Sequence, residues 1–332
     1  MGVVRECETR TTWRQTGGAR RGITRVTSPS TTDHGRRAGD PAGDPAGARL
    51  WTLGSGSKGN AVVLAHAGHH LMFDAGFELP ELVGRLRAAG LHPWDIDDVV
   101  LSHGHRDHVV GAAAGAHAYG WRVWGSLGTV WRWRALREIP LRGFMPGDTF
   151  TAGPWTVHTT PVPHDVDDSA AFLAASTVDP ALRVGYATDF GRAPDALVEL
   201  FRGASALVLE SNHDRELLRT GPYPPDRQAR VGGEHGHLSN DRSAAVLRAV
   251  AHPGLAQVVL AHISRHNNTP ELALASAGRA LAEAGYRGAL HAAPQHEVLG
   301  PLDVAPLGAA REAPHAAAEA AGGPIAVAAG IS

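Results

Sequence analysis

The sequence predicts a layered α/β domain over residues 49–302 of the 332-residue chain. Short apolar segments of strand length alternate with longer segments whose apolar residues recur at helical spacing. The strands come in two runs that are each interleaved with helices, which is typical of packed α/β layers. The hydrophobic content is 43% and the formal net charge is −2, a composition that favours a large core and excludes disorder throughout the chain.

The first run surrounds a glycine- and serine-rich turn at 54–60. The helix expected in this run, 79–89, has apolar residues three and four positions apart and ends before Gly90. The last strand of the run leads directly into a histidine-rich loop. The expected strands are 49–53, 61–65, 70–74 and 98–101.

The second run repeats this alternation. Its expected strands are 155–159, 183–188, 206–210 and 257–261. Its expected helices are 194–200, 239–251 and 271–284.

The two ends of the chain differ from this middle part. Residues 1–48 are rich in Arg, Gly and Thr, and residues 303–332 in Ala, Gly and Pro, so both are expected to be disordered tails. The first segment has no apolar core typical of a secretory signal. No apolar run reaches the roughly 20 residues of a membrane helix. We therefore expect a cytoplasmic protein that does not bind membranes.

The cysteine count limits the chemistry. Cys7 is the only cysteine, which excludes an intrachain disulfide framework, a cysteine-rich zinc site and a Cys-X-X-Cys redox pair. A metal ion would be held by nitrogen and oxygen ligands, and the chain has 20 histidines. The net charge also argues against a protein that binds nucleic acid by bulk electrostatics alone.

The strongest chemical signal is the segment SHGHRDH at 102–108. Imidazole and carboxylate groups are preferred ligands of zinc and its first-row neighbours. Residues two apart in an extended chain point the same way, so His103 and His105 can share one ion. Asp107 and His108 require a turn and can serve a second ion. The alternative is a solvated polar loop with chance histidines.

Three further candidates each follow an apolar segment: His164, Asp189 and His262. The ends of strands are where α/β sheets place ligand-binding groups. Each residue alone could be an ordinary surface or hydrogen-bonded side chain. Together with the 102–108 segment they complete the set of about seven ligands that two ions need.

In this order, the candidate ligands resemble those of the metallo-β-lactamase-fold hydrolases. Other segments are similar to one branch, the WalJ-like (YycJ-like) single-domain nucleases related to tRNase Z. They are LGSGSKGN at 53–60, ATD at 187–189, ESNHD at 210–214, GPYP at 221–224, GHLSN at 236–240, and LAHIS at 260–264 followed by Asn267 and Asn268. The resemblance covers roughly residues 50–300 and implies a four-layered αββα sandwich.

The resemblance also implies two divalent ions, zinc or manganese, with a bridging hydroxide that attacks the substrate. Asp189 would bridge the ions, and Asp107 would be catalytic as well as a ligand. The first ion would be held by His103, His105 and His164. The second would be held by Asp107, His108 and His262.

His237 is the candidate acid that protonates the leaving group, and Glu210 is the carboxylate that would hold it. The resemblance to tRNase Z suggests the same pairing. The alternative is a loop histidine and a strand-end surface glutamate without a shared role.

Candidates for substrate contact or for support of the ligands are Asn212, His213, Asn267, Asn268 and Lys58. Lys58 lies in the 54–60 turn, which lacks the Gly-Lys-Ser/Thr ending of a nucleotide P-loop. The segment 121–142 has four Trp and five Arg, which could stack on single-stranded nucleic acid or could pack in the core beside a solvated face.

The leading functional hypothesis is a dinuclear metal phosphodiesterase, a 5′-to-3′ exonuclease with nucleic acid, DNA in particular, as its substrate. One alternative is a thioester, lactone or β-lactam hydrolase on the same metal core, because one fold hosts several chemistries. The other is a metal-binding regulator without activity, which would be expected to have lost ligands. No ligand is missing from the sequence.

Overall fold

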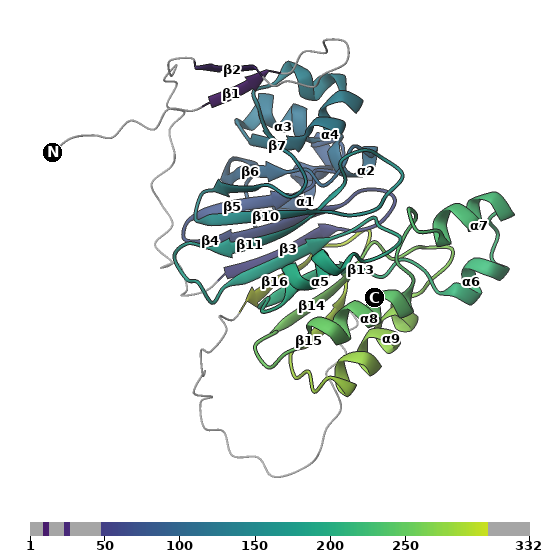
Figure 1. Ribbon diagram of the computed structural model, residues 1–332. Coiled ribbons are helices and arrows are strands. Elements are labelled where there is room, and N and C mark those ends of the chain that lie inside the picture. Colours follow the sequence, from purple (N-terminus) through teal and green to yellow (C-terminus); the bar gives the residue numbers. More distant parts are fainter. Residues whose placement is uncertain (1–8, 13–22, 27–47, 305–332) are drawn as a thin grey trace, which may run out of the picture.

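The computed structural model of the chain describes residues 9–12, 23–26 and 48–304. Its main part is built on two seven-stranded mixed sheets, each flanked by helices (Figure 1). The first sheet, in spatial order, is β16 (Leu299–Val304), β3 (Ala48–Gly54), β4 (Ala61–His66), β5 (His69–Phe73), β6 (Ile96–Val100), β7 (Arg122–Ser126) and β8 (Leu141–Phe144). The second is β15 (Ala289–Ala292), β14 (Gln257–Ala261), β13 (Ala206–Glu210), β12 (Arg183–Ala187), β11 (Ala170–Ser176), β10 (Trp155–Pro161) and β9 (Thr149–Ala152).

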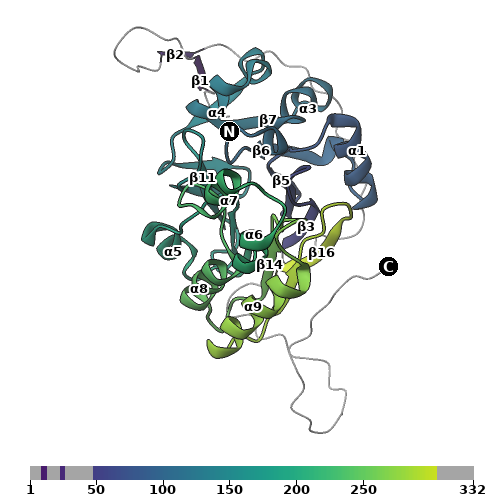
Figure 2. The same ribbon diagram turned by 90° about the vertical axis from the view of Figure 1, so that its right-hand side faces the viewer.

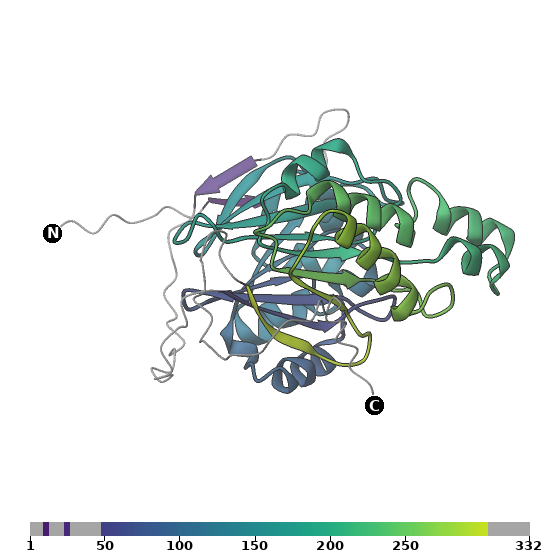
Figure 3. The same ribbon diagram turned by 90° about the horizontal axis from the view of Figure 1, so that it is seen from below.

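Helices cover the outer face of each sheet. Those that follow strands of the first sheet are α1 (Leu79–Ala88), α2 (Arg106–Val109), α3 (Ala112–Tyr119) and α4 (Leu127–Arg132), with 3₁₀ turns at Pro93–Asp95 and Arg134–Glu138. Those that follow strands of the second are α5 (Asp195–Phe201), α6 (Arg215–Thr220), α7 (Pro225–Gly232), α8 (Asn240–Val250) and α9 (Pro270–Glu283). In Figure 3 the blue helices and the green helices lie on opposite sides of the two stacked sheets.

The four layers follow from the two-residue alternation of the strands. Leu50 and Leu64 point into the core between the two sheets, where Phe73 stacks on the neighbouring rings of Phe172 and Tyr186. The intervening side chains of the same strands, including Trp51, pack against the outer helices. Because both faces of each sheet are covered, these strands are apolar on both sides. The α/β class and the αββα sandwich are therefore confirmed.

The strand directions place the loops with the candidate metal ligands at the carboxyl ends of parallel strands. Strands β5 to β8 run parallel to one another, and so do β12 to β15. The loops that follow β5, β6, β12, β13 and β14 therefore leave their sheets at the carboxyl ends of parallel strands. Asp74 and His262 directly follow such strands, and Asp189 lies two residues beyond β12. Their φ angles are left-handed, at 60° for Asp74, 53° for His262 and 61° for Asp189. Such angles are uncommon outside glycine and turn the chain sharply at each strand end.

The predicted strands and helices of the middle part are present, with ends shifted by one or two residues. Strand β3 starts at Ala48 and strand β16 ends at Val304, so regular structure extends slightly beyond the expected domain limits of 49–302. The other predicted tail residues lie outside the described part, except for β1 (Thr9–Thr12) and β2 (Ile23–Val26), which pair antiparallel. These two strands were not predicted; their Thr, Ile and Val residues favour extended backbone.

None of the helices within the described residues has the length and apolar character needed to cross a membrane.

Gly76 offers a test of how tightly the two strand-end loops pack. A Cβ at this position would overlap the backbone carbonyl of Asp107, whereas a Cβ on Gly84 in α1 would meet nothing within 4 Å. We expect Gly76→Ala to lower the free energy of unfolding by about 1–3 kcal/mol or more, because backbone must move. Gly84→Ala should raise it by about 0.5–1 kcal/mol. Urea denaturation of both variants measures this; equal stability of the two would contradict the packing.

Candidate metal centre

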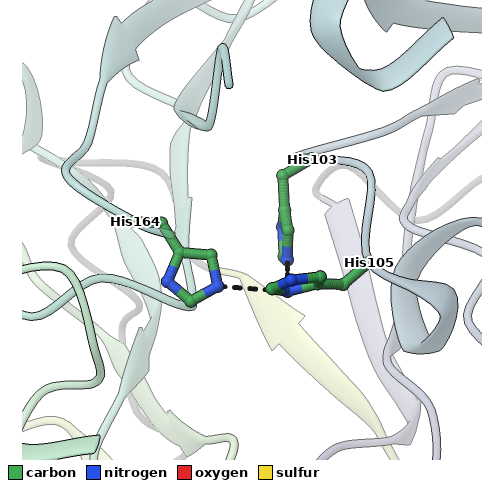
Figure 4. Close-up of side chains that lie close together, drawn as sticks. All are labelled: His103, His105 and His164. Atoms are coloured by element: carbon green, nitrogen blue, oxygen red, sulfur yellow. Dashed lines mark hydrogen bonds between the residues drawn. The ribbon is translucent and has the colours of Figure 1, made fainter. Parts of the chain in front are cut away.

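Three imidazoles converge from the two sheets. His103 and His105 follow β6, and His164 follows β10. His103 Nε2 lies 3.1 Å from His105 Nδ1, which lies 3.2 Å from His164 Nε2 (Figure 4). Nitrogen ligands about 2.0–2.1 Å from one tetrahedral zinc lie about 3.3–3.4 Å apart. The three nitrogens are therefore close to the spacing that a shared ion requires.

Other protein groups orient these rings. His164 Nδ1 lies 3.1 Å from the carbonyl oxygen of His235 and 3.2 Å from that of Gly236, so it carries the proton and leaves the Nε2 lone pair directed at the cluster. Ser102 Oγ lies 2.9 Å from His103 Nδ1. Asp165, which was not among the predicted residues, lies 3.3 Å from Nε2 of both His105 and His164.

A second group of ligand atoms lies beside the first. Asp107 Oδ2 is 3.6 Å from His262 Nε2 and 3.8 Å from His108 Nε2. Asp189 Oδ2 is 3.1 Å from His108 Nε2. Potential ligand atoms of Asp189, His103 and His108 all lie within 4.8 Å of one another, so Asp189 borders both groups. The structure thus brings all seven predicted ligand residues to one place.

Asp74 is a site residue that the sequence analysis missed. It is fully buried at the end of β5 and lies 2.7 Å from His108 Nδ1. Its carboxylate also accepts hydrogen bonds from Ser102 N and Oγ, at 2.7 and 2.9 Å, and from Tyr186 OH at 2.6 Å. Asp74 therefore keeps a proton on His108 Nδ1 and directs Nε2 toward the ligand group. A carboxylate directly after the strand beside β6 was the signal that could have found it.

His237 and Glu210 form the pair that the sequence analysis suggested. His237 Nδ1 lies 2.7 Å from Glu210 Oε1, and Glu210 Oε2 accepts backbone hydrogen bonds from Phe190 and Leu238. Burial raises the pKa of Glu210, but the neighbouring His237 outweighs this and holds the pKa below its usual value. Glu210 is thus an ionised group that holds Nδ1 of His237 and leaves Nε2 available.

The charges divide the histidines into two classes. Burial lowers the pKa of His103 and His164, and it lowers the pKa of His105 to about 4. Burial acts in the same direction on His262, but the carboxylates of Asp189, Asp107 and Glu210 raise its pKa to about 10. The pKa of His108 is also raised, against its burial, chiefly by Asp189 and Asp74.

The residues fit divalent cations. His262 Nε2 is a buried atom without a hydrogen bond, its carboxylate neighbour Asp107 Oδ2 being 3.6 Å away, although buried polar atoms are normally paired. The donor set of imidazoles and carboxylates suits zinc or manganese. Geometrically, the first ion could be held by His103, His105 and His164, and the second by Asp107, His108 and His262.

The candidate substrate residues differ in burial and in their hydrogen bonds. Asn212 Nδ2 donates to the carbonyl of His262 at 2.8 Å, and Asn268 Nδ2 bonds the carbonyls of Ser211 and Asn212, so both act as supports of the loops. Asn267 is buried beside them. Lys58 is exposed on the 54–60 turn, and His213 is buried in the loop after β13.

The tryptophans of 121–142 are divided between core and surface. Trp124 stacks on Phe150 in the core, with ring centroids 4.2 Å apart. Trp133 Nε1 donates to the carbonyl of Gly104 at 2.8 Å, which ties the segment to the ligand loop. Trp131 is 38% exposed, with Arg137 5.6 Å from its ring centroid.

Comparison with known proteins agrees with this geometry. A family model described as a beta-lactamase superfamily domain matches residues 69–263. Exodeoxyribonuclease YycJ of Bacillus anthracis is 30% identical over 247 residues, which cover 72% of this chain and 91% of that protein.

Two solved structures share the fold. The metallo-β-lactamase-fold protein YhfI of Bacillus subtilis matches with a TM-score of 0.59 and 16% identity, over 76% of this chain and 99% of that one. The short form of human tRNase Z matches with a TM-score of 0.53 and 17% identity, again over 76% and 99%. The fold implies binding of a divalent metal. The chain belongs to the metallo-β-lactamase superfamily of metal-dependent hydrolases, as a relative of the YycJ exonucleases.

Proposed function

We propose that this hydrolase is a phosphodiesterase of the nuclease type, acting on DNA as a 5′-to-3′ exonuclease with two divalent ions. The observation that carries the proposal is the His237–Glu210 pair, with Glu210 Oε1 only 3.3 Å from the candidate ligand His262. The name of the 30% identical relative, exodeoxyribonuclease YycJ, supports the same activity.

In this proposal the chain's residues have two tasks. His103, His105 and His164 would hold one ion, Asp107, His108 and His262 would hold the other, and Asp189 would be a ligand close to both groups. When bound, two such ions activate water and stabilise negative charge on a phosphodiester oxygen. Glu210 fixes His237 through Nδ1, so that Nε2 can give a proton to the leaving alkoxide.

The surface beside the ligand loop favours a nucleic-acid substrate over a small ester. Arg132 approaches Gly104 of the ligand loop so closely that a Cβ there would meet its side chain. Arg132, Arg134 and Trp131 are all exposed on α4 and the 3₁₀ turn that follows. Arginines beside an exposed indole provide charge for phosphates and a face for base stacking.

The decisive experiment measures release of nucleotides from single- and double-stranded DNA, and from RNA, with manganese or zinc. His237→Ala should lower kcat on DNA by about 10²–10⁴-fold while metal content is kept, because a proton donor is lost. The same variant should still cleave bis(p-nitrophenyl) phosphate at close to the unmodified rate, since the leaving group of this compound needs no proton. His117→Ala, an exposed histidine of α3 away from the ligand groups, is the control and should behave as the unmodified protein.

Asp107→Ala should abolish activity on every substrate together with metal binding. DNA cleavage that survives Asp107→Ala would contradict the proposal. Cleavage of acyl thioesters, lactones or β-lactams in place of DNA would favour the other hydrolase function on the same metal core. Full metal content without any hydrolysis would favour a regulator.

The two histidine classes predict different pH dependences of metal binding. Without metal, His108 and His262 hold protons near neutral pH, because their pKa values are raised, to about 10 for His262. An ion at this group must displace those protons, so its affinity should rise between about pH 6 and pH 8. His105, with its pKa near 4, is already neutral in this range, so the first ion should be lost only as the pH falls toward about 4.

Calorimetric titration with manganese in buffers of different ionisation enthalpy counts the released protons. We expect release with the ion at the second group and little with the first. Two binding events with the same proton count would contradict the assignment.

A further inference from the structure

A pocket of about 220 Å³ lies among α6, α7 and the start of α8, the helices labelled in Figure 2. The described residues that line it carry no carboxylate. Its polar lining consists of His213, Arg215, Arg219, Gln228, Ser239 and Arg242.

His213 indicates that the pocket takes a ligand. The side chain is only 3% exposed, and its Nδ1 is buried without a hydrogen bond. An unpaired buried polar atom is costly, so native structures normally give it a partner. Burial lowers the pKa of His213 to about 4, so the ring is neutral near pH 7 and has one N–H to donate.

The arginines indicate which kind of ligand. Arg215 pairs with Asp241, Arg219 pairs with Glu216, and Arg242 donates to the carbonyl of Gly191. Each guanidinium has five N–H donors, so these contacts leave donors for a further acceptor. Planar guanidinium groups match the oxygens of phosphate. Three of them beside a buried N–H therefore favour a phosphate over a neutral group.

The pocket adjoins the metal centre along the chain. Ser239 follows His237 by two residues, and His213 follows Glu210 by three. The backbone amide of Asn240 bonds the carbonyl of His213 at 2.8 Å, which joins these two loops. A phosphate in the pocket would thus lie near the group that a bound strand presents for cleavage.

We propose that the pocket binds the terminal phosphate of the strand that is being degraded. This inference rests on the nuclease function proposed above. A terminal phosphomonoester carries about −1.5 to −2 charge at pH 7, whereas an internal phosphodiester carries a single charge. An exonuclease must distinguish an end from the interior of a strand, and a terminal phosphate is present only at an end.

The test uses one DNA oligonucleotide with a 5′-phosphate, with a 3′-phosphate, or with hydroxyl groups at both ends. The unmodified protein should degrade the 5′-phosphorylated form about tenfold faster in kcat/KM than the hydroxyl form, as a charge-assisted contact would give, because a 5′-to-3′ exonuclease starts at that end. Arg219→Gln and Arg242→Gln should each remove most of that preference. Arg248→Gln, an exposed arginine of α8 that pairs with Glu283 outside the pocket, is the matched control and should keep it.

Equal rates on the three oligonucleotides, or a preference that both pocket variants keep, would overturn the inference. If no DNA is cleaved, the nuclease function fails, and the pocket is judged by calorimetric binding of thymidine dinucleotides with and without a terminal phosphate. Tighter binding of the phosphorylated dinucleotide that is lost in Arg219→Gln supports the pocket as a phosphate site. Equal binding of the two dinucleotides overturns it.

Discussion

Burial of negative charge where the two sheets meet is the constraint on which the site depends. Asp74, Asp189 and Glu210 are each at most 2% exposed. Carboxylates at such depth are costly unless cations and hydrogen-bond donors compensate them. Asp74 receives its compensation from Ser102, Tyr186 and His108. Asp189 faces His108 and His262, whose pKa values are raised. Protons on these histidines therefore compensate the charge of Asp189 when no metal is bound, and divalent ions would compensate it more strongly.

The fold supplies this arrangement through strand ends. Each sheet contributes a set of parallel strands, and left-handed residues lie just beyond the carboxyl ends of three of them. Left-handed backbone at Asp74, Asp189 and His262 has a conformational cost that the surrounding packing must offset. The candidate ligands are thereby held at the ends of packed strands.

Many of the strands and the candidate ligand residues could be predicted, because each of them leaves a local pattern in the sequence. Short apolar runs identify β3 and β4, and the candidate ligand residues come within a few residues of the ends of apolar strands. The four-layered arrangement needed the family resemblance, because periodicity alone does not pair strands. Strand β11 has the sequence AAFLAAS, and its four alanines favour extended backbone less than the valines of β4 do. Asp74 resembles any other strand-end carboxylate until the fold places it against His108.

The His213 pocket was also beyond sequence reasoning, because its lining residues come from α6, α7 and the start of α8, which meet only in the folded chain. Anomalous diffraction from crystals grown with manganese or zinc tests most directly whether the two neighbouring groups of ligand residues bind two ions. We expect two peaks, one about 2.0–2.3 Å from nitrogens of His103, His105 and His164, the other at the same range from Asp107, His108 and His262. A single peak, or none at the second group, would contradict a two-ion centre.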